Sequence, residues 1–131
     1  MTGVQTCALP IYSNYTSNVA VSASMFNDNN SGGMYMERNN QYSGLSKVVI
    51  SDSYFNNNST YWGFSLGTSA GADSVFVSNC QFLNNNDSWG EGGVLIKNDH
   101  YLNFSNNTVY DNKGYGMYAW NGGEKIITDN V

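Results

Sequence analysis

The stretch VVISDSYFNNN, residues 48–58, decides how this chain folds. Val48 and Ile50 alternate with polar residues, as a strand with one buried face requires, and Phe55 then opens a short run that ends in asparagine. The same pattern returns as VAVSASMFNDN at 19–29, VFVSNCQFLNN at 75–85, LNFSNNTVYDN at 102–112 and KIITDNV at 125–131. A pattern that recurs in this way predicts a solenoid in which each copy forms one coil.

The aligned copies form chemically uniform columns, which predict what stacks along the solenoid axis. We expect like residues to lie about 4.8 Å apart, the ordinary distance between paired strands. The predicted core stack is Phe26, Phe55, Phe82 and Val109. The predicted structural ladder, at a tight bend where asparagine tolerates left-handed backbone, is Ser24, Ser53, Cys80, Asn107 and Asn130. Cys80 fits this column as a small buried residue, so its role is predicted to be structural.

A second strand follows in each copy and is announced by glycine. It reads GMYM from Gly33, GFSL from Gly63, GVLI from Gly93 and GMYA from Gly116. Its outward column should contain Tyr35, Ser65, Leu95 and Tyr118. Most of the variation in repeat length falls after this strand, as expected when insertions are confined to one corner of a solenoid. The sequence therefore predicts an all-β parallel β-helix of about four coils plus a truncated fifth, without caps.

The composition agrees with one packed β domain and excludes other classes. Of 131 residues, 11% are charged and 15% are aromatic, whereas disordered chains combine high charge with few aromatics. With a net charge of −5 and five Lys plus Arg, the chain has no basic stripe for a nucleic acid. No apolar run approaches the roughly 20 residues of a membrane-spanning helix, so no span is expected in this segment.

The repeats resemble those of right-handed parallel β-helix proteins of the pectate lyase-like superfamily. The motif F-x-x-N appears as FNDN from Phe26, FNNN from Phe55 and FLNN from Phe82, with VYDN from Val109 as a degenerate copy. Together with GGMY at 32–35 and GGVL at 92–95, these motifs are similar to the repeats of polymorphic outer-membrane proteins and related bacterial surface adhesins. The resemblance implies a right-handed helix and an extracellular or cell-surface location. It implies little about chemistry, since these motifs serve packing and turns.

The charged residues do not form a catalytic pattern. Asp52 and Asp129 share a column but lie three coils apart, about 14 Å, and Asp28 and Asp111 share another column at the same separation. Glycosidase carboxyl groups lie roughly 5–9.5 Å apart. His100 is a loop histidine with no Cys or Asp at ligand spacing along the sequence. The sequence therefore predicts no catalytic residues, no metal site and no cofactor in this segment.

Aromatic side chains on or beside the glycine strands are the candidate binding residues. They are Tyr35, Tyr61, Trp62, Tyr118 and Trp120. Exposed rings on a rigid surface can stack on sugars or anchor a protein partner. The alternative is that these rings stack on one another or pack against the loop at 37–47.

Two functions remain open from the sequence. The first is an adhesin-like binding or scaffold role in a secreted or cell-surface protein, with a polysaccharide or a host or cell-surface protein as partner and further coils of the same parent chain beside it. The alternative is a carbohydrate-active lyase or hydrolase whose catalytic residues lie mostly outside this segment.

The opening MTGVQTCALPI, residues 1–11, does not continue the repeat pattern. Reverse-translated with one codon choice and an initiator GTG, it is similar to the end of a common short-read sequencing adapter. We therefore expect residues 1–11 not to be native, 12–18 to be a lead-in or partial coil, and 19–131 to be the β-helix, truncated at its C-terminus.

Overall fold

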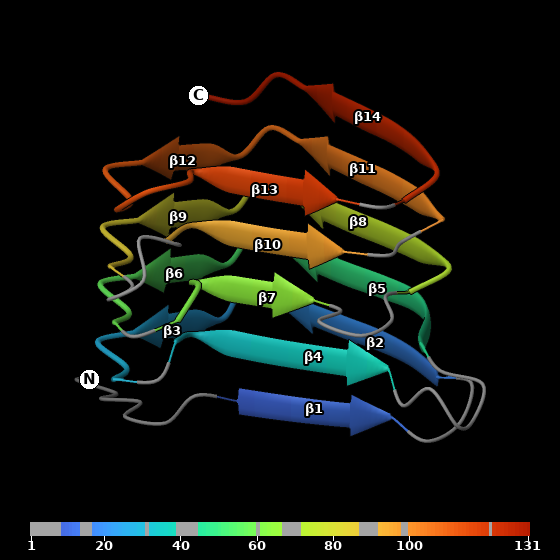
Figure 1. The fold of residues 1–131 in the computed structure, drawn as a ribbon, viewed down its shortest axis with the longest axis horizontal. Coiled ribbons are helices and arrows are strands. Elements are labelled where there is room, and N and C mark those ends of the chain that lie inside the picture. Colours follow the sequence, from blue (N-terminus) through green and yellow to red (C-terminus); the bar gives the residue numbers. More distant parts are fainter. Residues whose placement is uncertain are drawn as a thin grey trace.

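The computed structural model describes residues 9–13, 17–30, 32–38, 45–59, 61–66, 72–86, 92–97, 100–120 and 122–131. Within these ranges all regular secondary structure is β-strand. The strands build three parallel sheets that run side by side along one axis (Figure 1).

Successive strands of the chain go to different sheets. Sheet A contains β1 (Leu9–Ser13), β4 (Met34–Arg38), β7 (Phe64–Leu66), β10 (Val94–Lys97) and β13 (Met117–Trp120). Sheet B contains β2 (Ser17–Ser22), β5 (Leu45–Ser51), β8 (Ser74–Ser78), β11 (Tyr101–Ser105) and β14 (Glu124–Thr128). Sheet C contains β3 (Met25–Asn27), β6 (Tyr54–Asn56), β9 (Gln81–Leu83) and β12 (Thr108–Tyr110). Because the chain visits B, C and A in turn, it winds as a parallel β-solenoid, and the predicted all-β parallel solenoid is confirmed.

The register of the sheets follows the columns of the sequence repeat. Val48 pairs with Val75 and Ile50 with Val77 between β5 and β8, and all four side chains are buried. In sheet C, Phe55 lies between Phe26 and Phe82. The centroid of the Phe55 ring lies 4.8 Å from that of Phe26 and 4.9 Å from that of Phe82, and the three ring planes are nearly parallel. Val109 occupies the next position of this column and packs against the core while partly exposed.

Glycine opens the strands of sheet A because neighbouring coils come very close there. A Cβ on Gly33 would lie 2.4 Å from the Gly63 carbonyl oxygen, and one on Gly93 would lie 2.0 Å from the Gly116 carbonyl oxygen. Real Cβ contacts are longer than 3.0 Å, so no other residue fits these positions without moving the backbone. Here it is the missing side chain of glycine that matters, since φ is not positive at these positions.

The left-handed residues lie one position before the ladder column, which corrects the expectation that the ladder residues themselves make the bend. Positive φ values of 48–56° are found at Ala23, Asp52, Asn79, Asn106 and Asp129. A second set follows the strands of sheet C, at Asp28, Asn57, Asn84 and Asp111. Asn and Asp adopt this conformation at lower cost than most residues, which explains their abundance at both corners.

The described part of the N-terminal segment joins sheet A. Residues 9–13 form β1, which pairs in parallel with β4, so that Leu9 lies opposite Met34 and Ile11 opposite Met36. The expectation that residues 1–11 are not native stays a prediction. Residues 1–8 and 14–16 lie outside the described residues.

Candidate functional site

The outer face of sheet A carries the candidate binding residues. The register places Tyr35, Ser65, Leu95 and Tyr118 in one column, alternating with the inward residues of the core. Ser65 and Leu95 are buried although they face outward, whereas Tyr35 and Tyr118 are partly exposed. The accessible aromatic surface of this face therefore lies toward the two ends of the column.

Trp62 is buried, with only 4% of its surface exposed, so it does not offer the exposed ring expected from the sequence. Its ring stacks on Tyr118, with centroids 6.4 Å apart and an interplanar angle of 24°. The position equivalent to Trp62 in the next coil is Gly92. Because glycine has no side chain, it does not block the contact between the Trp62 and Tyr118 rings. Sequence reasoning left open that these rings stack on one another, and for this pair that alternative is the observed arrangement.

Three further aromatic side chains, within or just before strands of sheet A, are exposed. Tyr61 and Tyr115 are each 56% exposed and Trp120 is 49% exposed. The Tyr115 ring lies 5.3 Å from that of Tyr118. Trp120 is opposite Lys97 in the register of β13 and β10, and the Lys97 Nζ lies 5.5 Å from the centre of the Trp120 ring.

Tyr115, Tyr118 and Trp120 together form an aromatic row along β13. Tyr118 and Trp120 are two residues apart on one strand, so they face the same side with Cα atoms about 6.8 Å apart. Each has a packing partner: Trp62 stacks on Tyr118, and the Lys97 ammonium lies over Trp120. Rings held in this way lose little conformational freedom when a ligand stacks on them.

The predicted ladder column makes hydrogen bonds from coil to coil. The Ser24 N–H donates to Ser53 Oγ at 3.2 Å, and the Cys80 N–H donates to Asn107 Oδ1 at 2.9 Å. The Asn107 N–H in turn donates to Asn130 Oδ1 at 2.9 Å. These bonds lie at the bend between sheets B and C, where they satisfy backbone groups that no strand pairing reaches.

A second ladder, which sequence reasoning did not identify, consists of Asn29, Asn58, Asn85 and Asn112. The first three are buried, and each donates its backbone N–H and its side-chain amide to Oδ1 of the next asparagine. These residues are the final asparagines of the F-x-x-N motif. The motif was interpreted as a packing and turn signal, and its fixed spacing was the signal that could have predicted the ladder.

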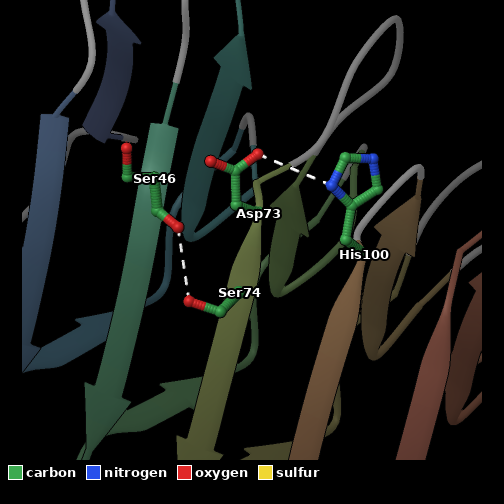
Figure 2. A network of polar contacts seen from close by, with 4 residues as sticks. All are labelled: Ser46, Asp73, Ser74 and His100. Carbon is green, nitrogen blue, oxygen red and sulfur yellow. Dashed lines mark hydrogen bonds and ion pairs between the residues drawn. The ribbon is translucent and has the colours of Figure 1, made fainter.

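The solenoid brings together one acid–base pair that is distant in sequence. His100 Nδ1 lies 3.6 Å from Asp73 Oδ1, and both side chains are more than half exposed (Figure 2). The spacing along the sequence did not indicate this pair, because a separation of 27 residues corresponds to one coil here. Figure 2 also shows Ser74, next to Asp73, donating its hydroxyl to the Ser46 carbonyl at 3.3 Å.

Potential metal ligands do not converge. In the part of the chain that the structure describes, no three side chains of His, Cys, Asp or Glu are placed to hold a metal ion together. Burial, with a smaller contribution from the nearby charge of Asp52, raises the pKa of the Cys80 thiol to about 11, so it stays protonated at neutral pH. Its Sγ–H points to the Ser78 carbonyl oxygen at 3.2 Å. Met34 and Met36 are buried in the core.

Comparison with known proteins places the chain in a family. A family model described as "Periplasmic copper-binding protein (NosD)" matches residues 2–131. No curated protein and no solved structure matches the chain significantly. NosD proteins have a β-helix fold of the pectate lyase-like superfamily, which agrees with the parallel solenoid and with the superfamily predicted from the repeats. Since the match extends over nearly the whole sequence, this chain belongs to the NosD family.

Proposed function

We propose that this segment is a rigid, adhesin-like binding scaffold outside the cytoplasm that holds a carbohydrate chain on the aromatic row of β13. The observation that carries the proposal is the pair of contacts that the rings of the row make, Trp62 with Tyr118 and Lys97 with Trp120. Tyr115 and Trp120, which belong to the same row, are about half exposed and so remain accessible to a ligand.

The chemistry of the row suits sugars. Tyrosine and tryptophan present a flat apolar ring together with a polar tip, so they can stack on the C–H face of a pyranose while hydrogen-bonding at its edge. The parallel sheets below supply a backbone that does not need to rearrange when the ligand binds. A protein partner with an exposed apolar anchor is the competing occupant and is an outcome of the test below.

The proposed location follows from the family. The NosD family is described as periplasmic, and a periplasmic location agrees with the broader expectation that this protein acts outside the cytoplasm. Among the described residues there is no helix with the length and apolarity to cross a membrane.

Copper binding, which the family description includes, is not supported by the described side chains. Copper sites in proteins use imidazole, thiolate and thioether ligands held together. Among the described residues, His100 contacts the carboxylate of Asp73 and Cys80 is a protonated thiol within the ladder. Met34 and Met36 are enclosed in the core, and the exposed Met25 lies on β3 of sheet C. The binding function proposed for the row does not involve the metal.

The enzymatic alternative has less support from the geometry. The register keeps Asp52 and Asp129 three strands apart, about 14 Å, which exceeds the separation of glycosidase carboxyl groups. Asp28 and Asp111 occupy a column of sheet C with the same separation. These two pairs of acids therefore give the enzymatic alternative no support.

The test is carbohydrate binding by the whole chain, screened on a glycan array and then measured by isothermal titration calorimetry. We expect Trp120→Ala to weaken binding about tenfold, which corresponds to roughly 1.4 kcal/mol and is reasonable for one stacked ring. Tyr110→Ala is the matched control, since Tyr110 is 69% exposed but lies on β12 in sheet C. An equal loss in both variants, or silence toward all glycans together with capture of a protein ligand, would overturn the proposal.

A further inference from the structure

Lys97 is the cation closest to the proposed ligand. Its Nζ lies 5.5 Å from the centre of the Trp120 ring, and its side chain is partly buried between β10 and that ring. Among the described residues, no carboxylate forms an ion pair with Lys97, and its ammonium lies over the ring of Trp120. Since no carboxylate of the described residues pairs with this ammonium, we expect it to accept an acidic group of a ligand that contacts the Trp120 ring.

The position of Lys97 along the strand limits which part of a ligand it can reach. It pairs with Trp120 at the end of β13, whereas Tyr115 and Tyr118 lie toward the start of that strand. A sugar that contacts the Trp120 ring on the side of Lys97 would therefore lie closer to the ammonium than sugars at Tyr118 or Tyr115 would.

We propose that the aromatic row selects an acidic oligosaccharide and that Lys97 determines this specificity by pairing with a carboxylate on the sugar at Trp120. This inference rests on the proposed carbohydrate-binding function. A charge-assisted hydrogen bond from the ammonium to a carboxylate is about twice as strong as a neutral one. A neutral sugar at the same position would leave the ammonium without an anion.

The net charge of −5 repels an acidic ligand, but this repulsion acts over longer distances than a direct contact with Lys97. Repulsion between solvated charges is largely screened beyond about 8 Å at physiological ionic strength. The proposed contact between the Lys97 ammonium and the sugar carboxylate is shorter than this distance, and the Lys97 side chain is partly buried. The local pair should therefore outweigh the overall charge at physiological salt and do so less clearly at low salt.

The experiment compares two ligands of the same shape, cellotriose and the trisaccharide in which each C6 hydroxymethyl group is oxidised to a carboxylate. Calorimetry in about 0.15 M salt should show the acidic trisaccharide binding about tenfold more tightly to the unmodified chain. Lys97→Gln should reduce this preference to less than threefold, and Lys97→Arg should retain most of it. Circular dichroism of each variant checks that the fold is intact.

The matched control is Lys47→Gln. Lys47 also lies over an aromatic ring, with its Nζ 5.0 Å from the centre of Phe76, but this pair is on sheet B. The Lys47 variant should bind both trisaccharides as the unmodified chain does. If both trisaccharides bind equally tightly, or if Lys97→Gln keeps the preference, the assignment of Lys97 is wrong while carbohydrate binding stands. If neither trisaccharide nor any other glycan binds, the proposed function itself fails.

Discussion

Asn58 donates its side-chain amide to Oδ1 of Asn85 at 2.9 Å, and both residues are completely buried. The Asn58 amide also donates to the Phe26 carbonyl of the coil before it, at 2.8 Å. Asn85 repeats this arrangement, with donors to the Phe55 carbonyl and to Asn112 Oδ1, each at 2.9 Å. Asn58 and Asn85 therefore each join three consecutive coils.

Replacing Asn85 by leucine should lower the free energy of unfolding by about 3–5 kcal/mol. Leucine has a similar shape but leaves the Phe55 carbonyl and both Asn58 donors unpaired inside the protein, at about 1–3 kcal/mol for each group. Urea denaturation followed by circular dichroism measures the change. The control is Asn84→Gly, because Asn84 is exposed with φ of 52°, a conformation that glycine adopts easily, and it should change stability by less than about 1 kcal/mol.

Phe55→Ala should cost about 3–5 kcal/mol of stability. The substitution removes the ring that lies between Phe26 and Phe82 and leaves a cavity in the middle of the core stack. Tyr54→Ala, at the neighbouring position that is 44% exposed, is the control in the same denaturation experiment. A loss below about 1 kcal/mol for Phe55→Ala would mean that this column does not form the core.

Gly93→Ala and Gly116→Ala should differ strongly, although both replace the glycine before a strand of sheet A. The added Cβ at position 93 meets the Gly116 carbonyl oxygen at 2.0 Å, whereas at position 116 the nearest atom is a methyl group of Val109 at 3.1 Å. A backbone oxygen cannot move without displacing the next coil, so Gly93→Ala should cost about 3 kcal/mol or more and Gly116→Ala about 1 kcal/mol. Equal melting temperatures would contradict the close approach of these coils.

Stability should fall between about pH 9 and pH 11 in a manner that depends on Cys80. Burial raises the pKa of this thiol from 9.0 to about 11, so in this window the unfolded chain releases a proton that the folded chain retains. The unfolded state binds fewer protons, and the free energy of unfolding therefore decreases as the pH rises. Cys80→Ser, which places in the ladder the residue found at Ser24 and Ser53, should remove this part of the pH dependence. Parallel pH profiles for the two proteins would show that the thiol does not titrate as described.

Much of this architecture was predictable because it depends on local patterns. The alternation of Val48 and Ile50, the spacing of Phe55 from Asn58, and the glycine before β4, β7, β10 and β13 are all visible in one repeat and recur in the next. Stacking then follows from the repetition, since coils of equal composition bury the same positions. The parallel sheets and their register therefore matched the alignment of the repeats.

The candidate site was less predictable because it depends on contacts between coils at the surface. Trp62 looked as exposed as Trp120 in the sequence, and it is buried because it lies over a glycine position and reaches Tyr118. Asp73 approaches His100 because their positions fall one coil apart, a relation that the residues around either one do not reveal.

The sequence by itself determined the solenoid, since periodic burial of apolar residues leaves few other ways to pack this chain. It also determined which residues form the core, through the two-residue alternation within each strand. Only the tertiary structure decided which aromatic rings stay accessible and which charges meet, because those outcomes depend on how side chains of unequal size fill the surface between coils. The row along β13 and the position of Lys97 beside it belong to this second group.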